Sequence, residues 1–251
     1  MPLTCQQLLA LARQDARCPG FTVQSGQLLN MVLSDLCQTY DFSTAMKTLQ
    51  FLLPTSQLNQ NGQAFFNLPT DYLRTTRYGS FYTIVGVPYP MIHCDLEEYD
   101  MLVQQANVAN FPVYFATDMS LSGMTNNGTP GVPVMLFWQI PSGAYAATLR
   151  YFSLMPEITT PESSITTPWF PNQTYLRRRV AGELMALTDD ERASAFLSDD
   201  DDRFPNGAGV MLRKFLQMQG DREDRAKQVT LDRRRFGTSF DRLKNTKTIG
   251  W

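Results

Sequence analysis

The feature that most constrains the fold of this sequence is a long stretch of β-strand character enclosed by two stretches with helical periodicity. From Phe42 to Met155, β-branched and aromatic residues alternate with Pro and Gly, which is typical of short strands joined by turns. On either side, apolar residues recur every three or four positions, as on one face of a helix. The sequence therefore predicts an α+β protein: a helical bundle built from N- and C-terminal helices, with an inserted β-rich subdomain and an extended C-terminal arm.

The helices are predicted from their caps and from their apolar faces. Thr4 is a suitable N-cap for a first helix, which Cys18-Pro19-Gly20 ends, and Ser25 is a suitable N-cap for a second. Asp95 is expected to cap a short helix inside the β-rich region. The helices predicted beyond the first two are Leu96–Gln105, Tyr175–Leu187 with Asp189–Leu197 as an extension, and Gly209–Ala226.

The strands are predicted from runs of β-branched and aromatic residues between turn signals. Two connections are expected to be hairpin turns, Thr55–Gly62 and Val85–Pro88, because each contains Gly between apolar runs. The predicted strands are Ala45–Leu53, Gly62–Leu68, Ser80–Val85, Tyr89–Cys94, Pro112–Thr117, Val132–Ile140 and Ala144–Met155.

The domain organisation follows from these changes in pattern. Residues 1–41 and 156–229 are expected to form the helical bundle, residues 42–155 the β-rich inserted subdomain, and residues 230–251 the extended arm. A Pro- and Thr-rich linker, Pro156–Pro168, marks the return from strands to helices.

Composition excludes several classes of function. A net charge of −2 gives no reason to expect nucleic acid as the main ligand. No apolar run approaches the ~20 residues that a membrane helix needs. Met1–Ala10 lacks the basic segment of a signal peptide, so the cysteines are expected to be free thiols.

The sequence holds no catalytic or metal-binding signature. It lacks a nucleophile motif and a phosphate-binding glycine loop, and its cysteines lack the paired spacing of a zinc site. The single histidine, His93, adjoins Cys94, but neighbours on a strand point to opposite faces. Acidic pairs such as Glu97-Glu98 are expected to lie near helix N-termini, where they interact favourably with the helix dipole. We therefore expect no catalytic, cofactor-binding or metal-binding residues in this sequence.

Two charged runs are given structural roles. Arg177-Arg178-Arg179 would point in three directions on a helix, so we expect solvated or ion-paired arginines rather than a DNA-binding patch. Asp199–Asp202 lacks the alternating ligands and central Gly of a calcium loop and is expected to be a solvated turn.

The segment Thr230–Trp251 is the predicted partner-binding element. It has no sustained helical period, and its basic residues outnumber its acids. Aromatic and Arg residues often contribute a large share of the binding energy at protein interfaces. A frayed tail and non-specific phosphate binding remain the alternatives. The candidate partner-binding residues are Leu231, Arg233, Arg234, Arg235, Phe236, Phe240, Arg242, Leu243, Lys244, Ile249 and Trp251.

Several ordered stretches between Leu68 and Phe236 carry a resemblance to a known family. They are Leu68–Arg74 (LPTDYLR), Asp95–Asp100 (DLEEYD), Tyr114–Ala116 (YFA), Leu149–Phe152 (LRYF), Pro168–Pro171 (PWFP) with Tyr175-Leu176, Gly220–Asp224 (GDRED) and Leu231–Phe236 (LDRRRF). In this order the chain resembles the adaptor, or head-completion, proteins of tailed phages, in a larger form with a β insertion.

The resemblance implies a structural virion protein at the neck of the particle, assembled in the host cytoplasm. Such adaptors form rings, typically dodecameric, between the portal protein and the tail. The implied partners are the portal, a tail nozzle or tail-tube protein, further copies of the chain and, without sequence specificity, packaged DNA, but no membrane. The alternatives are a tail nozzle or tail-completion protein, a particle-associated cell-wall lytic enzyme and a DNA-binding plug.

Overall fold

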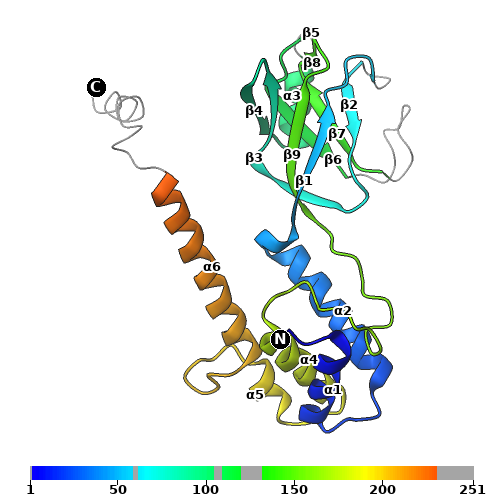
Figure 1. The fold of residues 1–251 in the computed structure, drawn as a ribbon, viewed down its shortest axis with the longest axis vertical. Helices are drawn as coiled ribbons and strands as arrows, with labels where there is room; N and C mark the ends of the chain where they lie inside the picture. The colour runs from blue at the N-terminus through cyan, green and yellow to red at the C-terminus, as the bar shows by residue number, and fades with distance from the viewer. Residues whose placement is uncertain (1, 59–61, 105–108, 120–131, 231–251) are drawn as a thin grey trace. The chain divides into compact units, whose positions relative to one another are not determined.

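The structure is a computed structural model, which describes residues 2–58, 62–104, 109–119 and 132–230 (Figure 1). Its helices are α1 (Cys5–Ala16), α2 (Thr22–Thr39), α3 (Leu96–Val103), α4 (Gln173–Leu187), α5 (Ala193–Leu197) and α6 (Ala208–Thr230), with a 3-10 turn at Ser43–Ala45. Its strands are β1 (Met46–Leu52), β2 (Ala64–Asn67), β3 (Tyr72–Ile84), β4 (Val87–His93), β5 (Ala109–Asn110), β6 (Tyr114–Asp118), β7 (Val134–Trp138), β8 (Ile140–Pro141) and β9 (Ala146–Ser153). The predicted α+β class is confirmed, with helices toward both ends of the chain.

The chain divides into two compact units. The first consists of residues 1–29 and 160–251, and the second of residues 30–159. The boundary falls inside α2, so the C-terminal half of that helix belongs to the unit that contains the sheet. The domain boundaries drawn from the sequence, at 41/42 and 155/156, stay a prediction.

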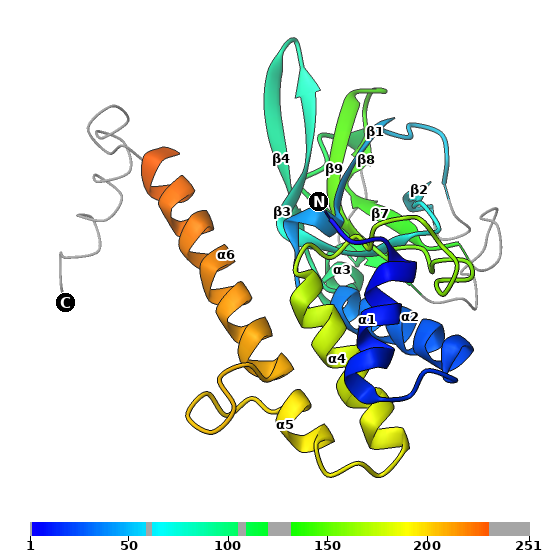
Figure 2. The same ribbon diagram turned by 60° about the horizontal axis from the view of Figure 1, so that its bottom comes forward.

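The first unit is built on the packing of α1 against α4 (Figure 2). Thr4 caps α1 as predicted: its side chain accepts a hydrogen bond from Gln7 N, and the Gln7 side chain accepts one from Thr4 N. The backbone N–H groups of Cys5 and Gln6 donate to Thr166 O and Ser164 O, at 2.9 and 3.1 Å. The linker after the strands therefore satisfies donors that the first turn of α1 leaves free.

The remaining helices of this unit pack on α4. Asn172 caps α4 by accepting a hydrogen bond from Tyr175 N at 3.1 Å. The Phe170 ring contacts Phe215 of α6 edge-on, with 5.1 Å between centroids. Gly182 of α4 leaves room for α5, because a Cβ there would lie 2.8 Å from Leu197 Cγ. The buried face of α4 consists of Tyr175, Leu176, Val180, Ala181, Leu184 and Met185.

Two helix predictions are wrong in detail. Helix α2 begins at Thr22, and Ser25 lies buried within its first turn, where its hydroxyl donates to Thr22 O at 2.7 Å. Ser25 is therefore not the N-cap. The segment Asp189–Leu197 does not extend α4, because Asp189 has φ of 53° and the chain turns before α5 begins. A left-handed residue interrupts the helical ladder, and the apolar spacing alone did not reveal it.

The second unit holds a curled seven-stranded sheet with the order β1-β9-β3-β4-β6-β7-β2. All neighbouring pairs are antiparallel except β4 and β6, which are parallel and connected through α3. The two edge strands approach each other, since Phe51 of β1 stacks on Phe66 of β2 with 4.3 Å between ring centroids. A separate short parallel pair, β5 and β8, completes the unit.

The predicted strands are all present, although their bounds differ. β3 begins at Tyr72, eight residues before the predicted start, because register shifts against β9 interrupt the alternation that a sequence pattern detects. Val85-Gly86 is a hairpin turn as predicted, with Ile84 paired to Val87. The Thr55–Gly62 prediction is confirmed in part: Leu58 forms an antiparallel bridge with Ala64, and Phe65 N donates to Gln57 O at 3.1 Å. The flanking strands do not pair with each other, because β1 pairs with β9 and β2 pairs with β7.

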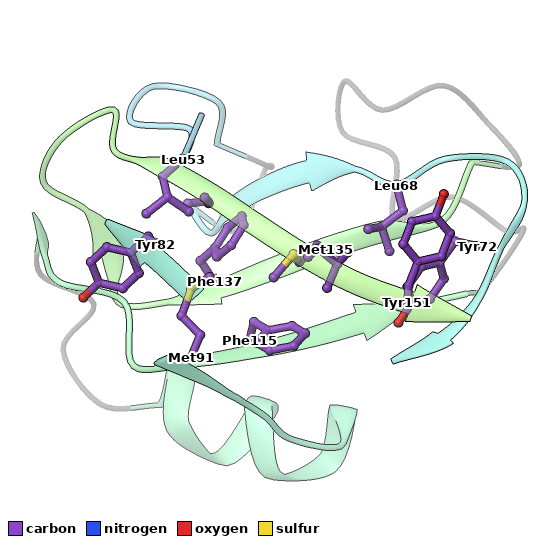
Figure 3. Packing of buried hydrophobic residues seen from close by; sticks show 12 residues of the cluster. Leu53, Leu68, Tyr72, Tyr82, Met91, Phe115, Met135, Phe137 and Tyr151 are labelled. Atoms are coloured by element: carbon purple, nitrogen blue, oxygen red, sulfur yellow. The ribbon is translucent and has the colours of Figure 1, made fainter. Parts of the chain in front are cut away.

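The interior of the sheet is filled by apolar side chains from nearly every strand. Figure 3 shows Leu53, Met91, Phe115, Phe137 and other side chains converging between the strands. A second cluster forms where α3 covers β6 and β7. There the buried Tyr99 donates its hydroxyl proton to Phe137 O at 3.2 Å. Asp95 occupies the N-cap position of α3 as predicted, but its side chain makes no capping hydrogen bond.

Candidate functional site

The predicted partner-binding residues, Leu231 to Trp251, lie outside the residues that the structure describes, so their role stays a prediction. Thr230 belongs to α6, although the sequence placed it in the arm. The candidate site can therefore be built only from the described residues. We first consider the groups that could carry chemistry and then the surfaces that could bind a partner.

His93 and Cys94 do not form a nucleophile pair. The His93 Nε2 lies 3.2 Å from Thr117 Oγ1, whereas the Cys94 thiol donates to Phe115 O at 3.5 Å. Burial raises the pKa of Cys94 to about 11, with the nearby Glu98 and Asp95 carboxylates acting in the same direction. Burial also lowers the pKa of His93, which Asp95 opposes. At neutral pH both groups are therefore uncharged, and Cys94 is not a thiolate nucleophile.

Each arginine of the run Arg177–Arg179 has its own partner, which confirms that the three point in different directions. Arg177 forms two hydrogen bonds of 2.6 Å with the Asp15 carboxylate of α1, and this pairing raises the pKa of Arg177. The Arg178 guanidinium lies 4.5 Å from the centre of the Phe196 ring. Arg179 pairs with Glu183 one turn later, at 2.9 Å. Arg177 and Arg178 connect α4 to α1 and α5, Arg179 pairs within α4, and the three do not form a common cationic patch.

The acidic runs serve the local backbone. Glu97 and Glu98 occupy the first turn of α3, where carboxylates interact favourably with the helix dipole, as predicted. Asp200 Oδ1 accepts a hydrogen bond from Asp202 N, and Asp201 pairs with Lys214 at 2.9 Å. Among the described residues, no group of three or more His, Cys, Asp or Glu is arranged to hold a metal ion.

Arg74, whose side chain forms hydrogen bonds with four other residues, was not identified as a site from the sequence. Its guanidinium donates to Asp41 Oδ1 at 2.6 Å, to Gln38 O at 2.7 Å and to Tyr40 O at 2.9 Å. Its fourth acceptor is Cys37 O at 3.3 Å, and the guanidinium carbon lies 5.7 Å from the Phe152 ring centre. Arg74 follows a register shift in β3, and such irregularities re-aim side chains. It satisfies carbonyls at the C-terminus of α2 and thereby ties that helix end to the sheet.

The stretch Leu68–Arg74 lies beside Leu149–Phe152, and both had suggested the family resemblance. β3 pairs with β9 here, and the Tyr151 hydroxyl donates to Asp71 at 3.1 Å. Asp71 also forms a 2.5 Å ion pair with Lys47 of β1. Burial and the Asp71 carboxylate raise the pKa of Tyr151 to about 12, so the phenol stays protonated. These residues connect three neighbouring strands.

The first candidate interaction surface is the end of the β3–β4 hairpin, which projects beyond the neighbouring strands (Figure 2). We name Val85, Val87, Tyr89 and Phe111 the apolar tip. Val85 is 97% exposed, and the other three side chains are also exposed. A chain of aromatic contacts supports them: Tyr89 to Tyr82, Tyr82 to Tyr145 and Tyr145 to Phe111, with centroid distances of 5.7, 5.9 and 5.8 Å.

The second candidate surface is a groove of about 730 Å³ at the seam between the two edge strands. We name it the seam groove. Phe51 and Phe66 form its stacked aromatic wall, and Leu52, Leu53 and Pro54 supply further apolar surface. Leu52 is 62% exposed. Thr55, Ser56 and Gln57 form the polar part of the rim.

Comparisons with known proteins identify the family of the chain. No curated protein matches it. In the described part of the chain, no helix is both long and apolar enough to cross a membrane. The sequence matches the family described as SU10 adaptor protein from residue 3 to residue 239, which confirms the resemblance to adaptor proteins that the residue motifs had suggested. Because this match covers nearly the whole chain, the protein belongs to the SU10 adaptor protein family.

Proposed function

We propose that this protein is the head-to-tail adaptor of a tailed-phage particle, a ring between the portal and the tail. In this role it closes the DNA-filled head and provides the docking surface for the tail. The observation that carries the proposal is the family match over residues 3–239. A match of this extent includes both units of the chain, so the proposed role belongs to the whole molecule.

The chemistry of the described residues supports a structural role. The groups that could have served catalysis are used for packing and pairing: Cys94 is a buried, protonated thiol and His93 is a neutral imidazole bonded to Thr117. Among the arginines, Arg74 and Arg177 hold elements of the fold together. Such side chains stabilise a rigid scaffold that presents surfaces to partners.

Ring formation and portal binding make different demands on the chain. A closed ring requires each copy to present two different surfaces, one for each neighbour. Portal binding is assigned to the segment Leu231–Trp251, with Phe236, Phe240, Ile249 and Trp251 as anchors and Arg233–Arg235 as charged partners. In a dodecameric ring the arms act together, so individually weak anchors give firm attachment through their high effective concentration. Contact with packaged DNA is non-specific in this arrangement.

Deleting Asp241–Trp251 tests the proposal. The truncated protein should keep its far-UV circular dichroism and its thermal midpoint, because every buried residue of the two cores lies outside the deleted segment. Its attachment to portal-bearing heads, measured by co-sedimentation, should fall by about tenfold or more, since several anchors are lost together.

The matched control is the full chain with Ile165→Ser, which changes an exposed apolar residue of the helical unit. This variant should bind like the unchanged protein. Normal attachment of the truncated chain would contradict the assignment of the arm. A DNA-binding plug, by contrast, would bind free DNA with an affinity that falls steeply with salt, and a lytic enzyme would clear a band in a cell-wall zymogram.

A further inference from the structure

We propose that the apolar tip of one copy docks into the seam groove of the next copy in the ring. The inference rests on the proposed function, because it requires copies arranged side by side. It assigns to the β-rich unit the two different surfaces that a head-to-tail contact needs. Both surfaces are already present within a single copy.

The first argument is the absence of charge on both surfaces. No Asp, Glu, Lys or Arg occurs between Lys47 and Asp71, the stretch that contains the seam groove. None occurs between Arg77 and Asp95, the stretch that contains the β3–β4 hairpin. Cores of protein interfaces are depleted in charge and enriched in aromatic residues, so the two surfaces complement each other.

The second argument is the conformation of the hairpin tip. Val85 has φ of 48°, a region that strongly disfavours β-branched residues, and Gly86 has φ of 82°. Asn or Gly at position 85 would satisfy the turn with less strain. A valine that is both strained and 97% exposed contributes little to the folded copy by itself. A partner that buries the Val85 side chain would explain why a valine occupies this strained, exposed position.

The third argument is that the hairpin is unsuited to docking through its backbone. The outer part of β4 has only β3 as a described neighbour, because β6 pairs with Ile92 and His93 alone. Pro88 and Pro90 in that outer part have no N–H to donate, and such prolines protect sheet edges from strand addition. Docking through this edge therefore uses side chains, and a groove with an aromatic wall is a matching surface.

The fourth argument is position and size. In the strand order, β9 and β3 separate β1, which borders the groove, from β4, which carries Val87 and Tyr89 of the tip. The two surfaces share no residue, so one copy can present both. Side chains such as Val and Tyr are small enough to enter a groove of about 730 Å³. The stacked Phe51 and Phe66 rings offer an aromatic wall against which Tyr89 can pack.

Mixed cross-linking tests the contact in the assembled particle. In a Cys18→Ser background the remaining natural thiols are buried. Full-length Val85→Cys and Ser56→Cys chains are mixed, assembled on portal-bearing heads and treated with a short bis-maleimide. We expect a covalent dimer in the mixture and none with either variant alone, because the contact joins two different surfaces. The double variant should give a ladder of higher oligomers.

The control replaces Val85 with another strongly exposed apolar position, Ile165, in the other unit. Ile165→Cys mixed with Ser56→Cys should give no dimer above the level of single variants. If the Val85→Cys mixture also stays at that level while micrographs show intact rings, the docking contact is wrong and the proposed function stands. If unmodified protein forms no ring on the portal, the proposed function itself fails and the contact with it.

A second variant separates assembly from folding. Val85→Asn relieves the strained turn and should leave the fold at least as stable, yet it removes the apolar side chain from the interface. We expect the protein concentration needed for ring formation to rise by about tenfold, which is typical for the loss of a hot-spot residue at an interface. Ile165→Asn should leave it unchanged. An unchanged ring with Val85→Asn would contradict the proposal.

Discussion

At the scale of single residues, Arg74 shows how one side chain holds two kinds of structure together. Its planar guanidinium has enough donors to serve three carbonyls at the end of α2 and the Asp41 carboxylate at once. A carbonyl at a helix end that loses its donor costs free energy when water cannot replace that donor. The conformation of the α2–β1 connection therefore depends on a residue more than 30 positions further along the chain.

Replacing Arg74 tests this role. Arg74→Ala should lower the free energy of unfolding of the β-rich unit by about 2–3 kcal/mol, because several charge-assisted hydrogen bonds are lost from a site only partly exposed to water. Urea unfolding followed by Trp138 fluorescence, with Trp169 and Trp251 replaced by Phe, measures the change.

Two further variants make the test specific. Arg74→Lys should recover only part of the loss, since an ammonium group cannot reproduce the fork of donors. Arg150→Ala removes an exposed arginine from the neighbouring strand and should change stability by less than about 0.5 kcal/mol. Equal effects of Arg74→Ala and Arg150→Ala would show that the hydrogen bonds to α2 do not matter.

At the scale of secondary-structure elements, the stretches that suggested the family are mainly positions where elements join. Asp71, Tyr151 and Lys47 link β3, β9 and β1, and Phe170 lies between α4 and α6. Tyr99 anchors α3 on the sheet. These residues determine the fold, whereas the hairpin tip carries strain that the fold alone does not explain.

The turn of the β3–β4 hairpin gives a prediction at this scale. Val85→Asn should stabilise the β-rich unit by about 0.5–1 kcal/mol, because Asn tolerates the left-handed conformation better than Val. Gly86→Ala should destabilise it by about 1 kcal/mol, since a Cβ is unfavourable at φ of 82°. The same urea experiment measures both. A destabilising Val85→Asn would mean that Val85 is not strained.

At the scale of the whole molecule, each unit has apolar residues enough for a core of its own. Leu9 of α1 and Leu149 of β9 are both fully buried, the first in the helical unit and the second within the sheet. We propose that the two units, residues 1–29 with 160–251 and residues 30–159, fold as separate domains. A multi-domain chain of this kind need not unfold in one step.

Matched Leu→Ala substitutions test this organisation. Each should cost about 2–5 kcal/mol because it leaves a cavity in a packed core. Leu9→Ala should lower the urea midpoint reported by Trp169, and Leu149→Ala the midpoint reported by Trp138, each in a chain with the other tryptophans replaced by Phe. If either substitution shifts both midpoints equally, the chain unfolds as a single cooperative unit.

The sequence by itself determined the features that depend on neighbouring residues. The Thr4 cap, the helical spacing around Leu176 and Val180, and the turn at Val85-Gly86 are local patterns, and the structure has each of them. The α+β class and the family resemblance followed from such patterns in order along the chain. The separation of Arg177, Arg178 and Arg179 likewise required only the geometry of one helix.

Only the tertiary structure decided which distant segments meet. A hairpin that pairs β1 with β2 along their length is locally plausible, but these strands form the two edges of the sheet, since β1 pairs with β9 and β2 pairs with β7. The hydrogen bonds of Arg74, the seam groove and the apolar tip all arise from contacts between residues far apart in sequence. Local spacing fixes the conformation of a segment, whereas its partners are chosen by the burial of apolar surface in the whole fold.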